Sequence, residues 1–354
     1  MRYLIAVSSL TPGSGLSRYV FSLCALLADK HEIYVVTTHN GNDRSYESEE
    51  LKHISIKIQL ISLGHKSKFG KYLGALRMIR KIEPDFIINN YNGVYQFVLP
   101  FIKKKINVVH ILHNDTDDFY RIGSINGSRV TGWIAPTMAI ADHFNHYTNN
   151  KFCDRVSVIP HGVEETSYSE KHNSRIEIVY AGVLYEHKGV KVLPSIIRQL
   201  IEAKVDLHFT IIGGGVLSGW LSDQFRYEQD AGIVTMTGVV PHEEVYKIMS
   251  KADIFLYPTH LDAFGLVIAE AMMNGAVPVV TLLPGITDNL IEDGKSGYLI
   301  AQDNVEAFVN ALICLIKDGN RRTEMSKAAY AKSMECFSIS SMKKEYIKYF
   351  GRFR

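Results

Sequence analysis

The segment HLDAFGLVIAEAMMNG, residues 260–275, carries two acidic residues, Asp262 and Glu270, on either side of an apolar run. The run is apolar at almost every position, which predicts a buried helix that ends at Gly275, a favourable C-terminal cap. A buried carboxylate without a partner is strongly unfavourable. Glu270 therefore needs either a Lys or Arg partner or ligand hydroxyl groups that donate hydrogen bonds to it.

The start of the same predicted helix could bind an anion. The backbone amides of Phe264, Gly265 and Leu266 would form its N-terminus, where phosphate groups commonly bind. Glu270 follows about one and a half turns later, within reach of ligand hydroxyls at that helix end. The spacing predicts a nucleotide-linked ligand with ribose at Glu270, diphosphate at the helix N-terminus and a further group near Asp262.

A second candidate lies in YAGVLYEHKGVKVL, residues 180–193. A predicted strand ends at Gly182, and a predicted helix begins near Lys188 and Gly189. An ammonium group beside a helix N-terminus is unfavourable unless something anionic lies there. A ligand phosphate would satisfy this condition, and so would the neighbouring Glu186.

The first half of the chain offers weaker candidates. In TPGSGLSR, residues 11–18, Gly13 and Gly15 lie between a predicted strand and a predicted helix, but Arg18 occupies the third glycine position of a dinucleotide fingerprint. A simple tight turn and a phosphate or acceptor contact remain equally open. His113 follows another predicted strand, and either a structural or a functional role fits it.

Two further patterns have simple alternatives. Asp115 and Asp117 form a DxD pattern, which some sugar transferases use to hold a divalent metal, but three-residue patterns arise by chance and a solvated acidic loop explains this one better. The turn Gly213–Gly215 follows a predicted strand and could be no more than a compact connection.

The elements that must position these residues alternate along the chain. Short runs rich in Val, Ile and Tyr alternate with segments of helical periodicity, which is typical of βαβ units and parallel sheets. The expected strands are 2–7, 32–38, 86–90 and 107–112, then 176–182, 207–213, 233–238, 253–259 and 277–281. The pattern predicts two doubly wound α/β domains that face each other across a cleft, with a hinge near residues 162–174.

The predicted boundaries are 1–165 for the N-terminal domain and 166–335 for the C-terminal one. Residues 336–354 are expected to form a basic helix that packs back on the N-terminal domain. The formal net charge of +2 for 354 residues argues against a nucleic-acid partner. Four scattered cysteines without a CxxC pair favour a reducing, cytoplasmic location, and no apolar stretch is long enough to span a bilayer. Residues 66–81, KSKFGKYLGALRMIRK, could instead lie on an anionic membrane surface or form an ordinary basic surface helix.

The segment DAFGLVIAEAMMNGAVPVV resembles the E-x7-E region of retaining glycosyltransferases of family 4, which are also called glycosyl transferases group 1 and have the GT-B fold. Further motifs occur in matching order along almost the whole chain, and the resemblance is strongest over residues 176–300. They are GSG, His113 after a strand, IPHGV, YAG with HKG, IIGGG, TGVVPHEEVYKIMSKADIFLYPT and EDGKSGYLI.

The resemblance implies transfer of a sugar from a nucleoside-diphosphate sugar, most readily a UDP- or GDP-sugar, with retention and without an essential metal. It places Glu270 at the donor ribose and Lys188 with Gly15 at the diphosphate. The amides of Phe264, Gly265 and Leu266 would contact phosphate and sugar. His113 and Asp262 would lie at the reaction centre. The acceptor would be a saccharide or a lipid-linked saccharide in cell-surface polysaccharide or glycolipid assembly.

Two positions depart from the family pattern. Asp262 is one methylene shorter than the usual glutamate, and Val183 stands where the family usually has an arginine five residues before the lysine. A basic residue elsewhere, such as Arg18, could replace that cation. The rival functions are a nucleotide-sugar epimerase or hydrolase, a metal-dependent transferase that uses Asp115 and Asp117, and a nucleotide-sugar-binding module without turnover.

Overall fold

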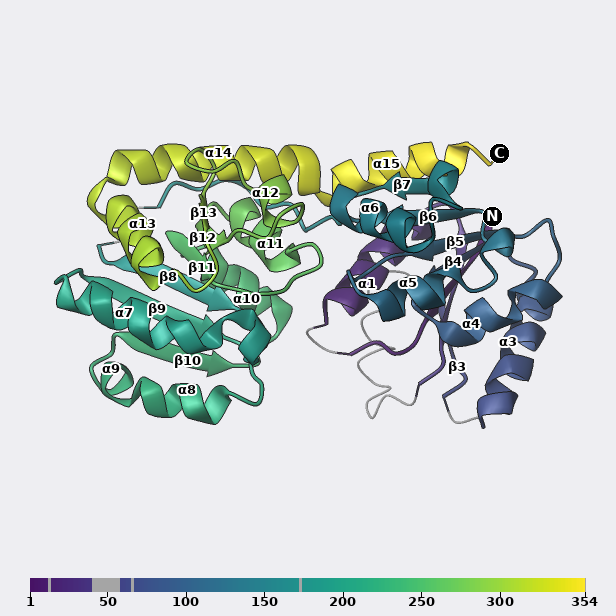
Figure 1. Ribbon diagram of the computed structural model, residues 1–354, viewed down its shortest axis with the longest axis horizontal. Helices are drawn as coiled ribbons and strands as arrows, with labels where there is room; N and C mark the ends of the chain where they lie inside the picture. The colour runs from purple at the N-terminus through teal and green to yellow at the C-terminus, as the bar shows by residue number, and fades with distance from the viewer. Residues whose placement is uncertain (12–13, 40–57, 65–66, 172–173, 354) are drawn as a thin grey trace. The chain divides into compact units, whose positions relative to one another are not determined.

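The computed structural model describes residues 1–353, apart from residues 12–13, 40–57, 65–66 and 172–173. The chain forms two compact units. Unit 1 comprises Met1–Pro160 together with Lys343–Arg354, and unit 2 comprises His161–Met342. Each unit is built around a parallel β-sheet (Figure 1).

The sheet of unit 1 has the strand order β3-β2-β1-β4-β5-β6-β7, and every described pair is parallel. Its strands are β1 (Arg2–Val7), β2 (Glu32–Thr37), β3 (Ile58–Ser62), β4 (Phe86–Asn90), β5 (Asn107–Ile111), β6 (Gly132–Ala135) and β7 (Val156–Val158). The described helices are α1 (Gly15–Ala28), α3 (Lys68–Ile82), α4 (Gly93–Val98), α5 (Asp117–Ser124) and α6 (Met138–Tyr147), with a 3₁₀ turn, η1 (Leu99–Phe101), after α4.

Helix α15 (Ile339–Gly351) brings the end of the chain onto unit 1. The hydroxyl of Tyr346 is hydrogen-bonded to that of Tyr19 in α1. The ring of Phe350 lies 5.4 Å from that of Tyr3 in β1 and 5.0 Å from that of Phe86 in β4. Residues from the end of the chain therefore complete the core beside the central strands of unit 1.

The sheet of unit 2 has the order β10-β9-β8-β11-β12-β13, again with parallel pairs throughout. Its strands are β8 (Ile176–Ala181), β9 (Leu207–Ile212), β10 (Val234–Gly238), β11 (Ile254–Tyr257), β12 (Val277–Thr281) and β13 (Tyr298–Ile300). Its helices are α7 (Leu193–Glu202), α8 (Ser218–Gln224), α9 (Arg226–Asp230), α10 (His242–Met249), α11 (Leu266–Met273), α12 (Thr287–Leu290), α13 (Val305–Lys317) and α14 (Gly319–Phe337).

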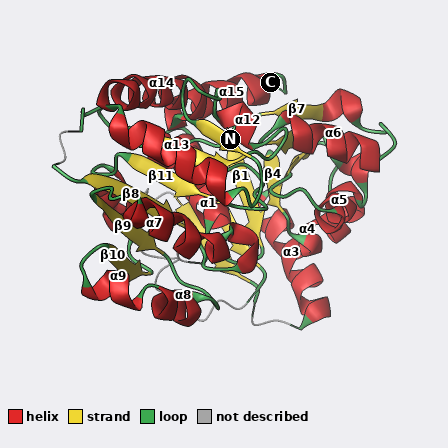
Figure 2. Ribbon diagram, turned by 60° about the vertical axis from the view of Figure 1, so that its left-hand side comes forward, coloured by secondary structure: helices red, strands yellow, loops and turns green. Residues whose placement is uncertain are grey.

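Burial explains why these segments adopt these elements. Strand β12 is buried at all five positions, as expected for a strand covered on both faces. Figure 2 shows the strands of this unit with helices packed against them. Helix α14 lies along α11, where the hydroxyl of Ser333 donates to the carbonyl of Ala269 at 2.9 Å. The apolar helix around Glu270 is therefore buried between the sheet and α14, as the sequence predicts.

The strand order locates the ligand edge of each sheet. Successive strands are added toward one side of the sheet and then toward the other, and this strand order reverses between β1 and β4 in unit 1 and between β8 and β11 in unit 2. In doubly wound sheets, ligands bind outside the carboxyl ends of the strands at this reversal. The loops that follow these four strands are therefore the first places to look for a site.

Candidate functional site

In unit 2, the two loops at the reversal carry the strongest sequence candidates. Strand β8 ends at Ala181 and leads to Lys188, whereas β11 ends at Tyr257 and leads to Asp262. A backbone hydrogen bond joins the two loops, from the amide of His260 to the carbonyl of His187 at 2.9 Å. Residues distant in sequence thus meet at the sheet edge expected to bind ligands.

Gly189 permits this close approach. Its φ is +67°, in the left-handed region that favours glycine. A Cβ atom added there would lie 1.7 Å from the carbonyl oxygen of Pro258. The glycine after Lys188 is therefore required for the β8 loop to lie against the β11 loop.

Lys188 and Asp262 form an ion pair across the two loops. The Lys188 ammonium donates to Asp262 Oδ2 at 2.9 Å and to the carbonyl oxygen of Leu261 at 2.7 Å, and only 15% and 17% of the two side chains are exposed. The Tyr257 hydroxyl also donates to Asp262 Oδ2, at 3.0 Å, while its ring lies 5.6 Å from the ammonium. The arrangement fixes one cation at the edge of the sheet.

The other oxygen of Asp262 faces the start of α11. Asp262 Oδ1 accepts hydrogen bonds from the amides of Ala263, Phe264 and Gly265 at 2.8, 3.3 and 2.9 Å. Burial favours the neutral acid, but the Lys188 charge and these hydrogen bonds outweigh it, so the Asp262 pKa lies below its ordinary value. Two amides that the sequence suggested for a ligand phosphate, those of Phe264 and Gly265, therefore point at the Asp262 carboxylate.

The backbone at the start of α11 depends on glycine. Gly265 is the N-cap of the helix with φ +85°, and a Cβ there would lie 2.9 Å from Ile268 Cδ1. Leu266 is the first helical residue. At the other end, Gly275 has φ +73° and its amide donates to the carbonyl of Met272 at 2.9 Å. The predicted C-terminal cap is thus present.

Glu270 lies one turn inside α11 and is 7% exposed. Its Oε1 is 4.0 Å from Nε2 of His242, the first residue of α10. The His242 ring packs edge-on against Tyr246 with 4.4 Å between ring centroids. The sequence suggested a Lys or Arg partner or a ligand, and the structure adds a histidine from a different helix.

The glycine-rich turn after β9 supports the Lys188 loop. A Cβ on Gly213 would lie 1.9 Å from the carbonyl oxygen of Gly182, and one on Gly215 would lie 2.6 Å from that of Leu184. The amide of Leu184 donates to the carbonyl of Gly214 at 3.0 Å. Val183, in this same loop, exposes 45% of its surface. The turn therefore packs directly on the loop that carries Lys188.

In unit 1, His113 follows β5 and reaches the end of β4. Its Nε2 lies 2.8 Å from Asn90 Oδ1, and its ring packs edge-on against Tyr19 at 4.8 Å. The Asn90 amide nitrogen faces the carbonyls of Ala6 and Ile88, which identifies Oδ1 as the acceptor. The His113 Nε2 therefore donates, and buried Asn90 fixes the orientation of the imidazole.

Gly15 is the first residue of α1, after β1, and Asn90 ends β4, so the two residues lie at the carboxyl ends of the two strands that flank the reversal. Arg18 lies one turn later, and its amide donates to the carbonyl of Ser14 at 3.1 Å. Gly13, suggested with Gly15 as part of the turn, lies outside the described residues. The structure thus brings Gly15 to the reversal edge of unit 1 and places Lys188, Asp262 and the start of α11 at that of unit 2.

The two aspartates of the DxD pattern lie at the start of α5 in unit 1, where Asp115 contacts neighbouring side chains. Asp115 accepts from the Tyr120 hydroxyl at 2.5 Å and lies 2.8 Å from Nδ1 of His143, while Asp117 begins α5. Among the described residues, no group of three or more His, Cys, Asp or Glu side chains is arranged to hold a metal ion. No helix within the described ranges is long and apolar enough to cross a membrane.

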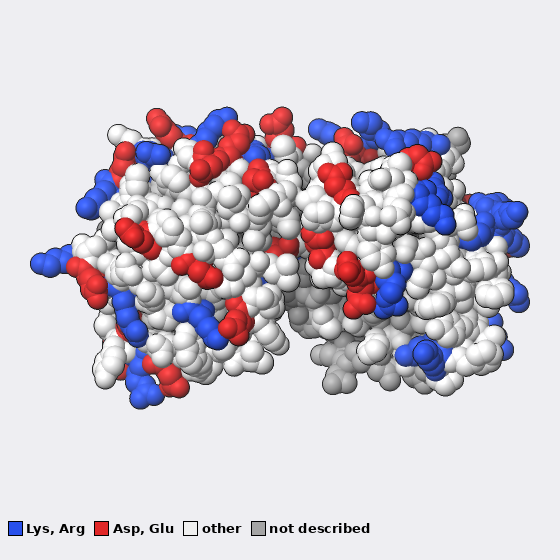
Figure 3. All heavy atoms as spheres, viewed as in Figure 1, with Lys and Arg blue, Asp and Glu red and all other residues white. Residues whose placement is uncertain are grey.

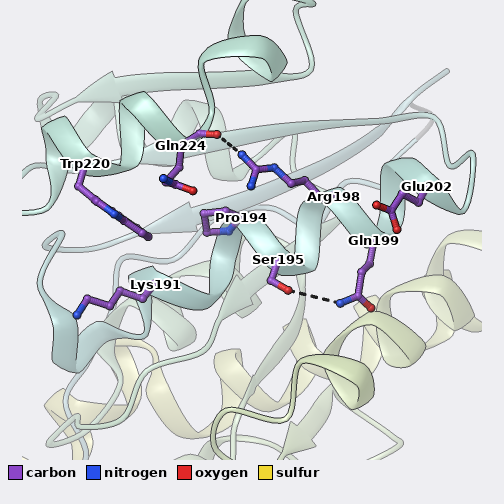
Figure 4. A pocket seen from close by; sticks show the side chains of 8 residues that line it. All are labelled: Lys191, Pro194, Ser195, Arg198, Gln199, Glu202, Trp220 and Gln224. Carbon is purple, nitrogen blue, oxygen red and sulfur yellow. Dashed lines mark hydrogen bonds between the residues drawn. The ribbon is translucent and has the colours of Figure 1, made fainter.

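A separate hollow of about 630 Å³ lies on α7 and α8 of unit 2 (Figure 4). Arg198 donates there to the carbonyl of Gln224 and to Glu228, so its guanidinium already has partners within the unit. Lys188, Asp262 and Glu270 are not among its lining residues. The lining residues are Lys191, Pro194, Ser195, Arg198, Gln199, Glu202, Trp220 and Gln224.

Comparison with protein families covers both units. The profile of Glycosyltransferase Family 4 matches residues 13–167, and that of Glycosyl transferases group 1 matches residues 164–332. The chain belongs to glycosyltransferase family 4. Its two-sheet architecture is the GT-B fold.

One curated protein is similar to this chain in sequence, and two solved structures are similar to it in fold. The Arabidopsis thaliana sulfoquinovosyl transferase SQD2 is 30% identical over 332 residues, covering 84% of this chain and 62% of SQD2. The chain spans less than two thirds of the length of the curated relatives that it matches first. The Anabaena protein Alr3699/HepE, solved in complex with UDP-glucose, superposes with a TM-score of 0.81 at 16% identity over 99% of this chain and 100% of HepE. The lipopolysaccharide outer core galactosyltransferase WaaB does so with a TM-score of 0.73 at 14% identity, over 99% of this chain and 100% of WaaB.

Three residues of the candidate site were not found from sequence. Tyr257 ends β11, a position that strand prediction could have marked as facing the ligand edge. Asn90 ends β4 in the same way. No sequence signal connects His242 with Glu270, because the contact joins two helices whose packing the sequence pattern does not specify.

Proposed function

We propose that this protein is a retaining glycosyltransferase that moves a sugar from a UDP-sugar to a saccharide or lipid-linked saccharide acceptor. The observation that carries the proposal is that Asp262 joins Lys188 to the backbone amides at the start of α11, at the strand reversal of unit 2. A cation beside a helix N-terminus is the arrangement expected for a diphosphate site. The two family profiles support the same reaction class.

The diphosphate would bind where Lys188 and the α11 amides now meet the Asp262 carboxylate. These groups already donate hydrogen bonds to the Asp262 carboxylate. This supports a phosphate ligand, because carboxylate and phosphate oxygens accept the same charge-assisted hydrogen bonds. Lys188, Phe264, Gly265 and Leu266 would then stabilise the negative charge that develops on the leaving diphosphate. Contact of Asp262 with the transferred sugar stays a prediction, and its present partners support an added role in positioning Lys188 until the donor binds.

The ribose would bind at Glu270. The Glu270 carboxylate is nearly buried, and a buried carboxylate needs donors. His242 Nε2 lies 4.0 Å from the carboxylate, and two ribose hydroxyls could donate charge-assisted hydrogen bonds to the same group. HepE binds UDP and UDP-glucose, which supports uridine as the base among the UDP and GDP alternatives.

Unit 1 would contribute the reaction centre through His113. Asn90 holds the His113 Nε2 as a donor and thereby orients the ring. The proposed role is to bind the sugar hydroxyl nearest the anomeric carbon. Gly15 is proposed as a donor-binding residue, because a glycine at the start of α1 leaves the backbone open to a ligand phosphate.

The proposed chemistry keeps the anomeric configuration. The bond from the anomeric carbon to the diphosphate oxygen breaks, and the acceptor oxygen bonds to the same face of that carbon. The leaving phosphate oxygen takes the acceptor proton. Lys188 and the helix amides balance the charge on the UDP that leaves.

The test of donor choice is thermal unfolding with UDP-, GDP- and ADP-sugars, because a ligand raises Tm only if it binds the folded chain. UDP-sugars should raise Tm, and Glu270→Ala should remove most of the shift. No shift with any nucleotide sugar would refute the donor site.

Turnover is then measured with the radiolabelled UDP-sugar that binds best. Label should move to an added acceptor with the donor's anomeric configuration, as judged by NMR of the product. Release of free sugar or epimerised donor without acceptor would favour the hydrolase or epimerase. Binding without turnover for any acceptor would favour the binding module, and loss of activity with EDTA would favour the metal-dependent transferase.

A further inference from the structure

Unit 1 exposes an unusual row of apolar side chains on α3. Phe69 and Leu73 expose 70% and 41% of their surfaces. Tyr72 and Leu76 are partly exposed and lie on the same side of the helix, because positions 69, 72, 73 and 76 follow helical spacing. The buried side of the helix is a different one, formed by residues such as Ala75 and Ile79. The exposed row is therefore not needed for packing against the sheet.

The neighbouring segment, α4 with η1, adds to this row. The Phe97 ring lies 6.2 Å from the Tyr72 ring, so α4 lies beside α3. Phe97 is 49% exposed and Phe101, in η1, is 72% exposed. We call the exposed apolar residues Phe69, Leu73, Phe97 and Phe101 the apolar patch.

Beside Phe101 is a groove of about 360 Å³. It is lined by apolar side chains from α3, from η1 and from the chain after η1, together with basic and acidic side chains. Among the basic residues, Arg2 donates to the carbonyl of Ile82 at 2.5 Å and Lys103 lies 2.7 Å from Glu83. The lining residues are Arg2, Leu76, Ile79, Arg80, Glu83, Pro84, Asp85, Phe101, Ile102, Lys103, Lys105 and Ile106.

The charge around the groove is mainly positive. The groove is lined by four basic side chains and two carboxylates. The basic residues are Arg2, Arg80, Lys103 and Lys105, and the acidic ones are Glu83 and Asp85. The exposed residues Lys68, Arg77, Lys81 and Lys104 extend the positive charge along α3 and past η1. Figure 3 shows basic side chains gathered along the side of unit 1 where Figure 1 labels α3.

We propose that this face docks on a bilayer that contains anionic phospholipid. The apolar patch enters the headgroup region, where amphipathic surfaces bury apolar side chains. A lipid phosphate binds basic side chains that line the groove, and the first carbons of its lipid lie against the groove's apolar residues. Surrounding lysines attract the negative surface of the bilayer. The docking face lies near the amino ends of β1 and β5, since Arg2 and Ile106 line it, whereas His113 follows the carboxyl end of β5. It is therefore separate from the proposed reaction centre.

The test measures sedimentation of the full chain with vesicles. We expect binding to vesicles of phosphatidylcholine mixed with phosphatidylglycerol, weaker binding when NaCl is raised, and little binding to phosphatidylcholine alone. Lys103→Glu should lower the partition coefficient by at least about 5-fold. Phe101→Ser should lower it by about 5-fold or more.

Each variant has a matched control. Lys295 lies 2.7 Å from Glu292 and is exposed to a similar extent, so Lys295→Glu makes the same charge change without touching the face. Tyr227 is 83% exposed in unit 2, and Tyr227→Ser is the control for Phe101→Ser. Both controls should sediment as the unchanged protein does.

Three results would overturn the proposal: no binding to the mixed vesicles, equal loss in a variant and its control, or retention of binding in both face variants. The Tm shift with UDP-sugar is measured in parallel on all four variants. It should stay unchanged, which makes failure of the docking face distinguishable from failure of the donor site. Retained vesicle binding with no UDP-sugar shift would count against the donor site alone.

Discussion

The ion pair between Lys188 and Asp262 provides the most direct test of the proposed site. Lys188→Met keeps the length of the side chain but removes its charge. The Asp262 carboxylate would remain largely buried, with the Tyr257 hydroxyl and three amides as its remaining donors. Removing one partner of a fully buried pair costs about 3–5 kcal/mol. Because both side chains keep some exposure, we expect about 2–3 kcal/mol of lost unfolding free energy in unit 2.

Lys191→Met is the matched control from the next turn of the same loop. Lys191 lies 2.6 Å from Glu186, yet 51% and 71% of the two side chains are exposed. An exposed pair contributes below about 1 kcal/mol. The two variants therefore remove the same charge from pairs of similar length, and mainly burial differs.

The assay is urea unfolding followed by tryptophan fluorescence. The two tryptophans, Trp133 and Trp220, lie in different units, so a Trp133→Phe background leaves Trp220 to report unit 2. The variant Lys188→Met combined with Asp262→Asn should cost less than the sum of the single changes, because it leaves no buried charge unpaired. Equal costs for Lys188→Met and Lys191→Met, or strict additivity in the double variant, would refute the account of the pair.

Three further predictions concern the same unit. Glu270→Ala should weaken UDP binding by about 10- to 100-fold in calorimetry, since it removes charge-assisted hydrogen bonds to the ribose; unchanged affinity would exclude the ribose role. Gly189→Ala should lower the unfolding free energy by about 2 kcal/mol or more through its clash with Pro258 and its positive φ, whereas Gly219→Ala, in an open helical position, should raise it slightly, as urea midpoints will show. The Asp262 pKa is depressed in the folded state, so its contribution to stability is present above the ordinary Asp range near pH 4 and is lost as pH falls through the folded pKa. The stability difference between the unchanged protein and Asp262→Asn should shrink in acid, and a difference that is constant down to the folded pKa would contradict this.

The sequence predicts the central elements well because a buried strand has an unambiguous pattern. Residues 2–7, 86–90 and 277–281 were predicted as strands with the bounds of β1, β4 and β12. Strands β3, β6, β7 and β13 were not predicted. They are three to five residues long, and β3 and β7 are only partly buried, so neither alternation nor a long apolar run marks them.

In the candidate site, too, some features could be predicted from the sequence and others could not. A glycine-bounded loop after a strand indicated where Lys188 and the start of α11 would lie, since strand ends and helix starts follow from local sequence. The orientation of Asp262 did not follow, because it depends on a loop conformation in which the carboxylate turns back to its own amides. The proximity of His242 to Glu270 depends on how two helices pack, which no local pattern specifies.

The placement of α15 bears on how the protein is made. Tyr346 and Phe350 complete the core of unit 1, although more than a hundred residues of unit 2 separate them from the rest of that unit. A ribosome synthesises the chain from its N-terminus, and domains commonly fold in that order. Here the first sheet would emerge early with the surface around Tyr3, Tyr19 and Phe86 uncovered, and unit 2 could finish folding before unit 1. The order of completion would then be the reverse of the order of synthesis for the two halves of this protein.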